Sequence, residues 1–339
     1  MSFAMITTEQ LDFLYPSRSD SRLEKILRTT RDPTTGEFKG GLESTDACSI
    51  EDQNRACALR GLPRKLWPNI PSCDPQRLAG LLETIIDARR SKPAPSCLAS
   101  ATYVRNRRIG VLGSILDLVR NNPELDIAWL TAGDYNSRFD PKASWPSAIP
   151  GARMRFEHQL ERSGALTAPG FLIAYLHGYF LPDVKAFQLQ YRGIVGGQKL
   201  KCIREWGKLR RNGEVAPSQI KIAIHVVRDL VQQISGMMHN FLSAIERTAT
   251  GDISSFKRMT EPYDSVYLIW LSQHSLADML ILNGAFYLDG RLVLAECCNA
   301  VASRAISRLP LVSPPSIHPG RQRGRKLQSV AGSRILPGV

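Results

Sequence analysis

Two strand-like segments on either side of a short turn constrain this fold more than any other feature. The segments FLIAYLHGYF (171–180) and AFQLQYRGIV (186–195) are separated only by LPDVK at 181–185. A connection this short joins neighbouring antiparallel strands, whereas parallel strands need a crossover of a dozen residues or more. The sequence therefore predicts an antiparallel hairpin in the middle of the chain.

The second segment has one polar and one apolar face. Gln188, Gln190 and Arg192 alternate with Leu189 and Tyr191, and alternate residues of a strand point to opposite faces. The polar face is either plain surface, a working site, or a site that has lost its chemistry.

The flanking segments predict an α+β protein. DIAWLTAG from residue 126 is typical of a strand, 151–164 of a helix closed by Gly164, and 196–209 of a short basic helix. The resulting order of strand, helix, strand, strand, helix is most of a split β-α-β plait, the ferredoxin-like arrangement. We expect this plait to carry added helices and a helical N-terminal region.

Three further predictions concern the C-terminal half. Apolar residues recur at helical spacing across 219–247, which predicts one long helix of about eight turns. The apolar run in DSVYLIWL (264–271) predicts a buried strand. Asp289-Gly290 predicts a hairpin turn between AFYL and RLVL.

The N-terminal part is predicted to be helical with loops. Helices are expected at 20–30, at 74–90 with Asp74 as N-cap, and at 104–121, after a Pro-containing break at 91–96. The last helix begins with three arginines, whose charge opposes the helix dipole. Either a nearby carboxylate or a bound phosphate would compensate, and the carboxylate is the simpler expectation.

These patterns divide the chain into four regions. They are a mixed helical region with loops, a connecting helix, the plait domain, and a basic tail expected to be disordered. Their bounds are 1–95, 96–125, 126–296 and 297–339.

Composition narrows the class of protein. Hydrophobic residues make up 43% and charged residues 22%, which excludes a wholly disordered chain. The net charge of +13 favours a polyanionic partner such as DNA. The seven cysteines form no Cys-x-x-Cys pair and are typical of reduced thiols. No apolar run is long enough for a membrane span, so we expect a cytoplasmic protein without a membrane partner.

Residues 126–295, about half the chain, resemble the catalytic domain of the HUH endonucleases, the rolling-circle replication initiators and relaxases. The segments around 171–197 and 262–284 are similar to uncharacterised plasmid-type proteins of alphaproteobacteria, which have a His-x-His step where this chain has Gln190-Tyr191-Arg192. The resemblance implies a plasmid or mobile-element protein that handles DNA.

The chemistry of the resembled enzymes is not supported by the matching residues. Two histidines at i and i+2 would hold a divalent metal, and a tyrosine would attack the phosphate. Glutamine at 190 is a weak ligand, and arginine at 192 stays cationic. None of the nine tyrosines has Lys three residues on. The chain therefore resembles a degenerate member with a former metal-site face at Gln190 and Arg192.

A basic run downstream suggests DNA binding without cleavage. The candidate phosphate contacts are Arg192, Lys199, Lys201, Arg204, Lys208, Arg210 and Arg211. If about six of them contact phosphate, the log–log salt slope would be about −5. Tyr191 and Trp206 can add base stacking. The alternative is a solvated helix face with Trp206 in the core.

Two alternatives from other classes remain open. One is a metal-dependent nicking enzyme that uses His177, and only this reading requires a divalent metal; no other cofactor is expected. The other is a scaffold with no nucleic-acid role, whose basic residues would be spread evenly over the surface. A lone histidine in an apolar strand is most often a packed, hydrogen-bonded residue.

Overall fold

The computed structural model describes most of the region from 43 to 295. The described ranges are 43–64, 74–87, 96–139, 145–213, 220–238, 243–247, 253–288 and 291–295. The predicted helix at 20–30, nearly all of the break at 91–96, and the basic tail lie outside the described residues.

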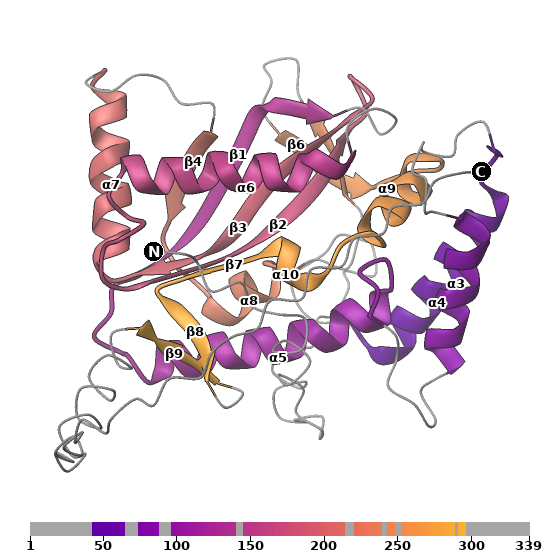
Figure 1. The fold of residues 1–339 in the computed structure, drawn as a ribbon, viewed down its shortest axis with the longest axis horizontal. Coiled ribbons are helices and arrows are strands. Elements are labelled where there is room, and N and C mark those ends of the chain that lie inside the picture. Colours follow the sequence, from indigo (N-terminus) through magenta and orange to yellow (C-terminus); the bar gives the residue numbers. More distant parts are fainter. Residues whose placement is uncertain are drawn as a thin grey trace, which may run out of the picture. The chain divides into compact units, whose positions relative to one another are not determined.

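A seven-stranded sheet forms the centre of the described chain (Figure 1). Its order is β4-β1-β3-β2-β5-β6, with β7 also paired to β2. The strands are β1 (Ile127–Phe139), β2 (Phe171–Leu181), β3 (Ala186–Gly196), β4 (Ile220–His225), β5 (Ser243–Arg247), β6 (Ile253–Arg258) and β7 (Leu280–Asn283). β2 and β3 pair antiparallel from Phe171↔Gly196 to Leu181↔Ala186, so the predicted hairpin is confirmed.

Helices and a second small sheet surround this sheet. The helices are α3 (Thr45–Gly61), α4 (Pro75–Asp87), α5 (Ala101–Arg120), α6 (Trp145–Arg162), α7 (Gln198–Arg211), α8 (Leu230–Ser235), α9 (Tyr263–Leu271) and α10 (Leu276–Met279). The small sheet pairs β8 (Ala285–Leu288) with β9 (Arg291–Leu294). Together these elements make the chain an α+β protein.

α6 and α9 pack against the apolar face of the sheet through stacked aromatic side chains. The ring of Tyr191 on β3 stacks on Phe156 of α6, with centroids 4.6 Å apart. Phe187, on the same face of β3, stacks on Tyr267 of α9 at 5.2 Å. Burial of large aromatic rings contributes strongly to core stability, so the strand alternation read from the sequence decides which side these helices cover.

α5 and the segment after α8 pack on the opposite, polar face. His177 of β2 hydrogen-bonds the carbonyl of Met237, just after α8. Arg108 of α5 donates to the carbonyl of Ser235, at the end of α8. α5 and the segment after α8 therefore cover the face of the sheet that carries the polar residues of β3. In Figure 1, α5 runs along this side of the sheet.

One hydrophobic core includes described residues from the first three of the four predicted regions. Leu59 of α3, Leu82 of α4 and Leu112 of α5 belong to the same buried cluster as Leu130 and Phe187 of the sheet. The N-terminal helices are therefore part of the packed unit that carries the sheet.

The predicted long helix at 219–247 is wrong. This range contains β4, the short helix α8 and β5. Ile220, Ile222 and Ile224 also alternate with period two, and β-branched residues fit a pleated strand. Residues 220–225 satisfy both the helical and the strand periodicity. They form a strand because β4 pairs antiparallel with β1 along its whole length.

The predicted strand at 264–271 is also wrong, because these residues form most of α9. All residues from Ser265 to Leu271 are buried. A short run that is apolar on every side has no period, and so does not distinguish a buried strand from a buried helix.

The remaining predictions of single strands and helices in the described ranges agree with the structure. The strand from residue 126 is β1, and the helices expected from 74, 104, 151 and 196 are α4, α5, α6 and α7. Gly164 follows α6 with φ +72°, a left-handed conformation that favours glycine. β8 and β9 pair antiparallel with Leu288 opposite Arg291, as the predicted hairpin requires, and the turn residues 289–290 lie outside the described residues.

A carboxylate compensates the basic start of α5, as expected. Asp52 of α3 is fully buried and accepts hydrogen bonds from the backbone N–H of Ala101 (2.6 Å) and Thr102 (3.1 Å) and from the hydroxyl of Ser100 (2.9 Å). Arg108 forms an ion pair with Glu43 at 3.0 Å. The helix N-terminus is thus closed by protein groups.

Candidate nucleic-acid interface

The structure brings His177, Gln190 and Arg192 together on the polar face of the sheet. His177 of β2 is directly opposite Gln190 of β3, and Tyr175 is opposite Arg192. Directly opposed residues of an antiparallel pair have their side chains on the same face. This is the face that was predicted from the sequence to be a former metal site.

His177 is held as a neutral hydrogen-bond donor. Its Nε2 faces the carbonyl oxygen of Met237, which can only accept, so Nε2 carries the proton. Burial and the nearby Arg192 charge lower the pKa of His177 to about 3. The nitrogen that faces Met237 is thus occupied by a backbone contact.

Arg192 places a permanent positive charge on the same face. Its guanidinium carbon lies 5.1 Å from the centroid of the Tyr179 ring, a cation–π contact. Within the part of the chain that the structure describes, no group of three or more His, Cys, Asp or Glu residues is placed to hold a metal. The face predicted from the sequence as a former metal site thus carries a guanidinium packed on an aromatic ring.

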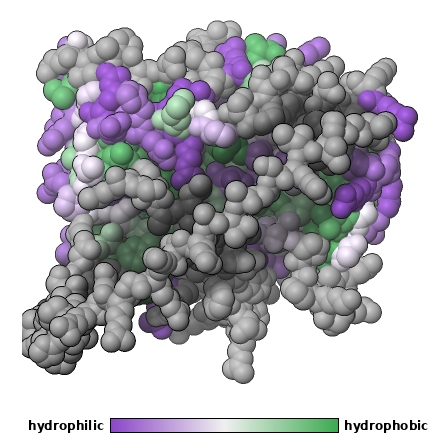
Figure 2. Space-filling model, in the orientation of Figure 1, coloured by the Kyte–Doolittle hydropathy of each residue, from purple (hydrophilic) through white to green (hydrophobic). Residues whose placement is uncertain are grey.

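The half-exposed helix α7 carries a stripe of four exposed cations, which we call the α7 stripe. Its members are Lys201, Arg204, Lys208 and Arg211. Their spacing of three, four and three residues puts them on one side of the helix over about 15 Å. In Figure 2, hydrophilic residues gather where α7 stands in Figure 1.

Two predicted phosphate contacts are engaged by the protein itself. Lys199 is 2% exposed and its Nζ donates to the carbonyls of Ala165 (2.9 Å) and Leu166 (3.1 Å), so its prediction as a contact is wrong. Arg210 is half-buried and donates to the carbonyl of Ile220 at 3.1 Å. Both side chains thus hydrogen-bond α7 to neighbouring backbone segments.

Arg204 is exposed but paired. Its Nη1 lies 2.6 Å from a carboxylate oxygen of Asp126, and about half of each side chain is accessible to solvent. Exposed ion pairs of this kind contribute only about 0–1 kcal/mol. A phosphate can therefore compete with Asp126 for this guanidinium.

The predicted stacking residues are both covered. Tyr191 is 2% exposed and stacked on Phe156, so it is a core residue. Trp206 of α7 is half-buried, and the guanidinium of Arg162 lies 5.3 Å from its ring centroid. The indole ring thus links α7 to α6.

The predicted contacts divide between two faces. α6 covers the side of β3 on which Tyr191 lies, and α7 stands beside α6 through Trp206. Arg192 points to the opposite side, because neighbouring strand residues alternate. The α7 stripe and Arg192 therefore do not form one surface.

Sequence reasoning grouped these cations by proximity along the chain. The spacing of Lys201, Arg204, Lys208 and Arg211 was readable and would have separated the stripe from Lys199 and Arg210. The carbonyls that hold Lys199 belong to residues 33 and 34 positions earlier, and no local pattern marks such a contact.

Comparison with known protein-family models, curated proteins and solved structures found no match to this chain. No helix within the described ranges has both the length and the apolar character needed to cross a bilayer.

Replacing His177 with glutamine should flatten the pH dependence of stability. The folded pKa is about 3 and the ordinary value is 6.5, so below about pH 6.5 the unfolded chain takes up a proton that the folded chain does not. Wild-type unfolding free energy should therefore fall by up to about 1.4 kcal/mol per pH unit between about pH 6.5 and 3.

Urea unfolding of both proteins at pH 7 and pH 5 measures this effect. The wild type should lose about 2 kcal/mol more than His177→Gln over that interval. Parallel pH profiles would contradict the neutral, buried state of His177.

Proposed function

We propose that this protein binds DNA through the α7 stripe and does not cut it by metal-dependent chemistry. The observation that carries the proposal is the four exposed cations on one side of α7. Their span of about 15 Å covers about five successive phosphates of one DNA strand, which are about 3.4 Å apart along the helix axis, so it has room for four contacts. Each phosphate neutralised releases condensed counterions and so favours binding.

The order of elements supports a relationship to the plait-type DNA-processing proteins. The chain runs β1, α6, β2, β3, α7, β4, and these strands lie in the order β4-β1-β3-β2 with antiparallel neighbours. This order is the one expected of a ferredoxin-like plait. It favours a degenerate member of the replication-initiator and relaxase group.

The other candidate functions have less support. Nicking through His177 would require the imidazole to leave the carbonyl of Met237 and a buried position. An inert scaffold would spread its basic residues evenly, whereas six of the 14 residues of α7 are Lys or Arg and one is acidic. The concentrated charge favours a polyanionic partner.

Fluorescence polarisation with labelled DNA at 50 and 200 mM salt, with and without Mn²⁺, tests the proposal. Four phosphate contacts predict a log–log slope of about −3.6 on duplex and about −2.8 on single strands. Affinity should thus fall about 150-fold or about 50-fold over this salt range. Binding that is absent or independent of salt contradicts the proposal, and Mn²⁺-dependent cleavage would favour the nicking enzyme.

A further inference from the structure

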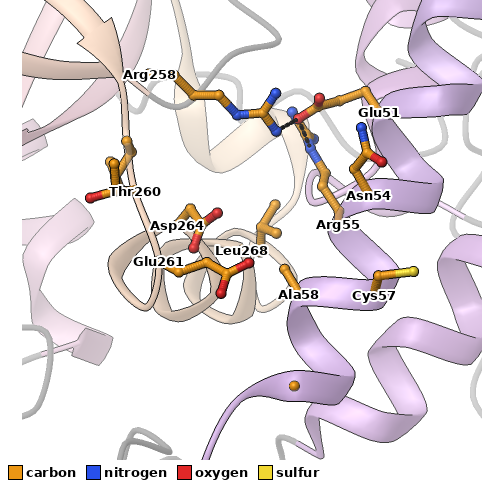
Figure 3. A pocket seen from close by; sticks show the side chains of 12 residues that line it. Glu51, Asn54, Arg55, Cys57, Ala58, Arg258, Thr260, Glu261, Asp264 and Leu268 are labelled. Carbon is orange, nitrogen blue, oxygen red and sulfur yellow. Dashed lines mark hydrogen bonds and ion pairs between the residues drawn. The ribbon is translucent and has the colours of Figure 1, made fainter.

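A pocket of about 590 Å³ lies away from α7, between α3, the end of β6 and α9 (Figure 3). Ligand sites in proteins commonly enclose about 300–1,000 Å³. This pocket is therefore large enough for a small molecule, and the proposed DNA binding makes no use of it.

One wall of the pocket is positive. A single oxygen of Glu51, Oε1, accepts from Nε of Arg55 and from Nη2 of Arg258, both at 2.9 Å. Two guanidinium groups therefore share one carboxylate, which leaves a net charge of +1 on this wall. The Arg258 side chain is 52% exposed, so its guanidinium is accessible to a ligand as well as to Glu51.

The facing wall is negative. The carboxylates of Glu261 and Asp264 both line the pocket. Neither forms an ion pair with another described residue, although the nearby charge of Arg258 partly offsets the effect of burial on the pKa of Asp264. Asp264 accepts a hydrogen bond from the N–H of Ser265 at 2.6 Å. Burial raises the pKa of its carboxyl, and a bound cation would offset that cost of burial.

Apolar and neutral groups complete the lining between the charged walls. Ala58 of α3 and Leu268 of α9 supply apolar surface, while Asn54 and Thr260 supply an amide and a hydroxyl. The pocket thus presents a cation, an apolar surface and two carboxylates in one enclosure.

We propose that this pocket binds a small zwitterion of amino-acid to dipeptide size. The ligand's ammonium group pairs with Asp264 and Glu261, its carboxylate pairs with Arg258, and its apolar body lies on Ala58 and Leu268. Arginine suits the second role because its guanidinium can bind a carboxylate through two parallel hydrogen bonds. Neither end of such a ligand would remain unpaired.

Calorimetric titration of the full chain with leucyl-leucine tests this proposal. The matched probes are N-acetyl-leucyl-leucine, which lacks the cation, and leucyl-leucine amide, which lacks the anion. We expect saturable binding of the free dipeptide with a dissociation constant of about 1 mM or tighter, and at least about tenfold weaker binding of each capped form. No binding of the dipeptide, or equal binding of either capped form, overturns the proposal.

Two variants assign the ends of the ligand. Asp264→Asn should bind leucyl-leucine and its N-acetyl form equally well. Arg258→Gln should bind leucyl-leucine and its amide form equally well. Asp117→Asn and Arg77→Gln are matched controls at exposed positions and should bind as the wild type does. Variants at 258 and 264 that keep full discrimination overturn the assignment, and unfolding curves verify that each variant is folded. DNA binding is measured separately, so failure here leaves the α7 proposal intact.

Discussion

Removing the four cations of the α7 stripe is expected to reduce DNA affinity on the order of 100- to 1,000-fold at about 0.1 M salt. Each lost phosphate contact removes about 0.9 from the log–log salt slope on duplex DNA, so the slope should approach zero. The substitutions are Lys201→Ala, Arg204→Ala, Lys208→Ala and Arg211→Ala. Fluorescence polarisation over a salt series measures both quantities.

A matched variant separates position from net charge. It removes four exposed arginines from α4, α5, the segment after β4, and β9. They are Arg77, Arg120, Arg228 and Arg291, each replaced with alanine. This variant has the same net charge as the stripe variant but should keep most of the affinity and slope. Equal losses in both variants would mean that binding follows overall charge, and would contradict a site on α7.

Replacing Asp52 with alanine is expected to cost about 4 kcal/mol of unfolding free energy. The buried carboxylate accepts three hydrogen bonds at the start of α5, from two backbone N–H groups and the hydroxyl of Ser100. Hydrogen bonds to charged groups contribute about 1.5–3 kcal/mol each and do not add fully. Without Asp52, buried donors lose their acceptor at the N-terminus of a 20-residue helix.

Urea denaturation followed by circular dichroism measures the effect of Asp52→Ala. Asp117→Ala is the control, because this aspartate lies on the same helix α5 with 66% of its side chain exposed. It should change stability by less than about 0.5 kcal/mol. A loss under about 1 kcal/mol at Asp52 would show that the α5 start is held by other contacts.

Local sequence patterns predicted the secondary structure correctly where a segment satisfied a single periodicity or contained a clear turn signal. The β2–β3 hairpin follows from a short turn between alternating segments, and the end of α6 follows from Gly164. The segment 220–225 satisfied both a helical and a strand period, and only its pairing with β1 made it a strand. The run 266–271 had no period, so its helical state could not be read from the sequence.

Part of the candidate site was also predictable from local sequence patterns, and part was not. Arg192 and Gln190 were assigned to one face of β3 from alternation, and the structure places His177 opposite Gln190 as neighbouring strands require. The burial of Lys199 was not predictable, because its carbonyl partners come from the segment after α6. The bipolar pocket was not predictable either, because Glu51 and Arg258 are separated by 207 positions.

The sequence by itself determined the charge surplus, the central hairpin, the two faces of β3 and the stripe spacing on α7, because each depends on residue type and short-range geometry. Tertiary structure alone decided that 219–247 breaks into strand, helix and strand, that 264–271 coils into a helix, and which cations stay in solvent. Those outcomes depend on hydrogen bonds and burial between segments far apart in the chain, and the free energy of such contacts is not recorded in any local pattern.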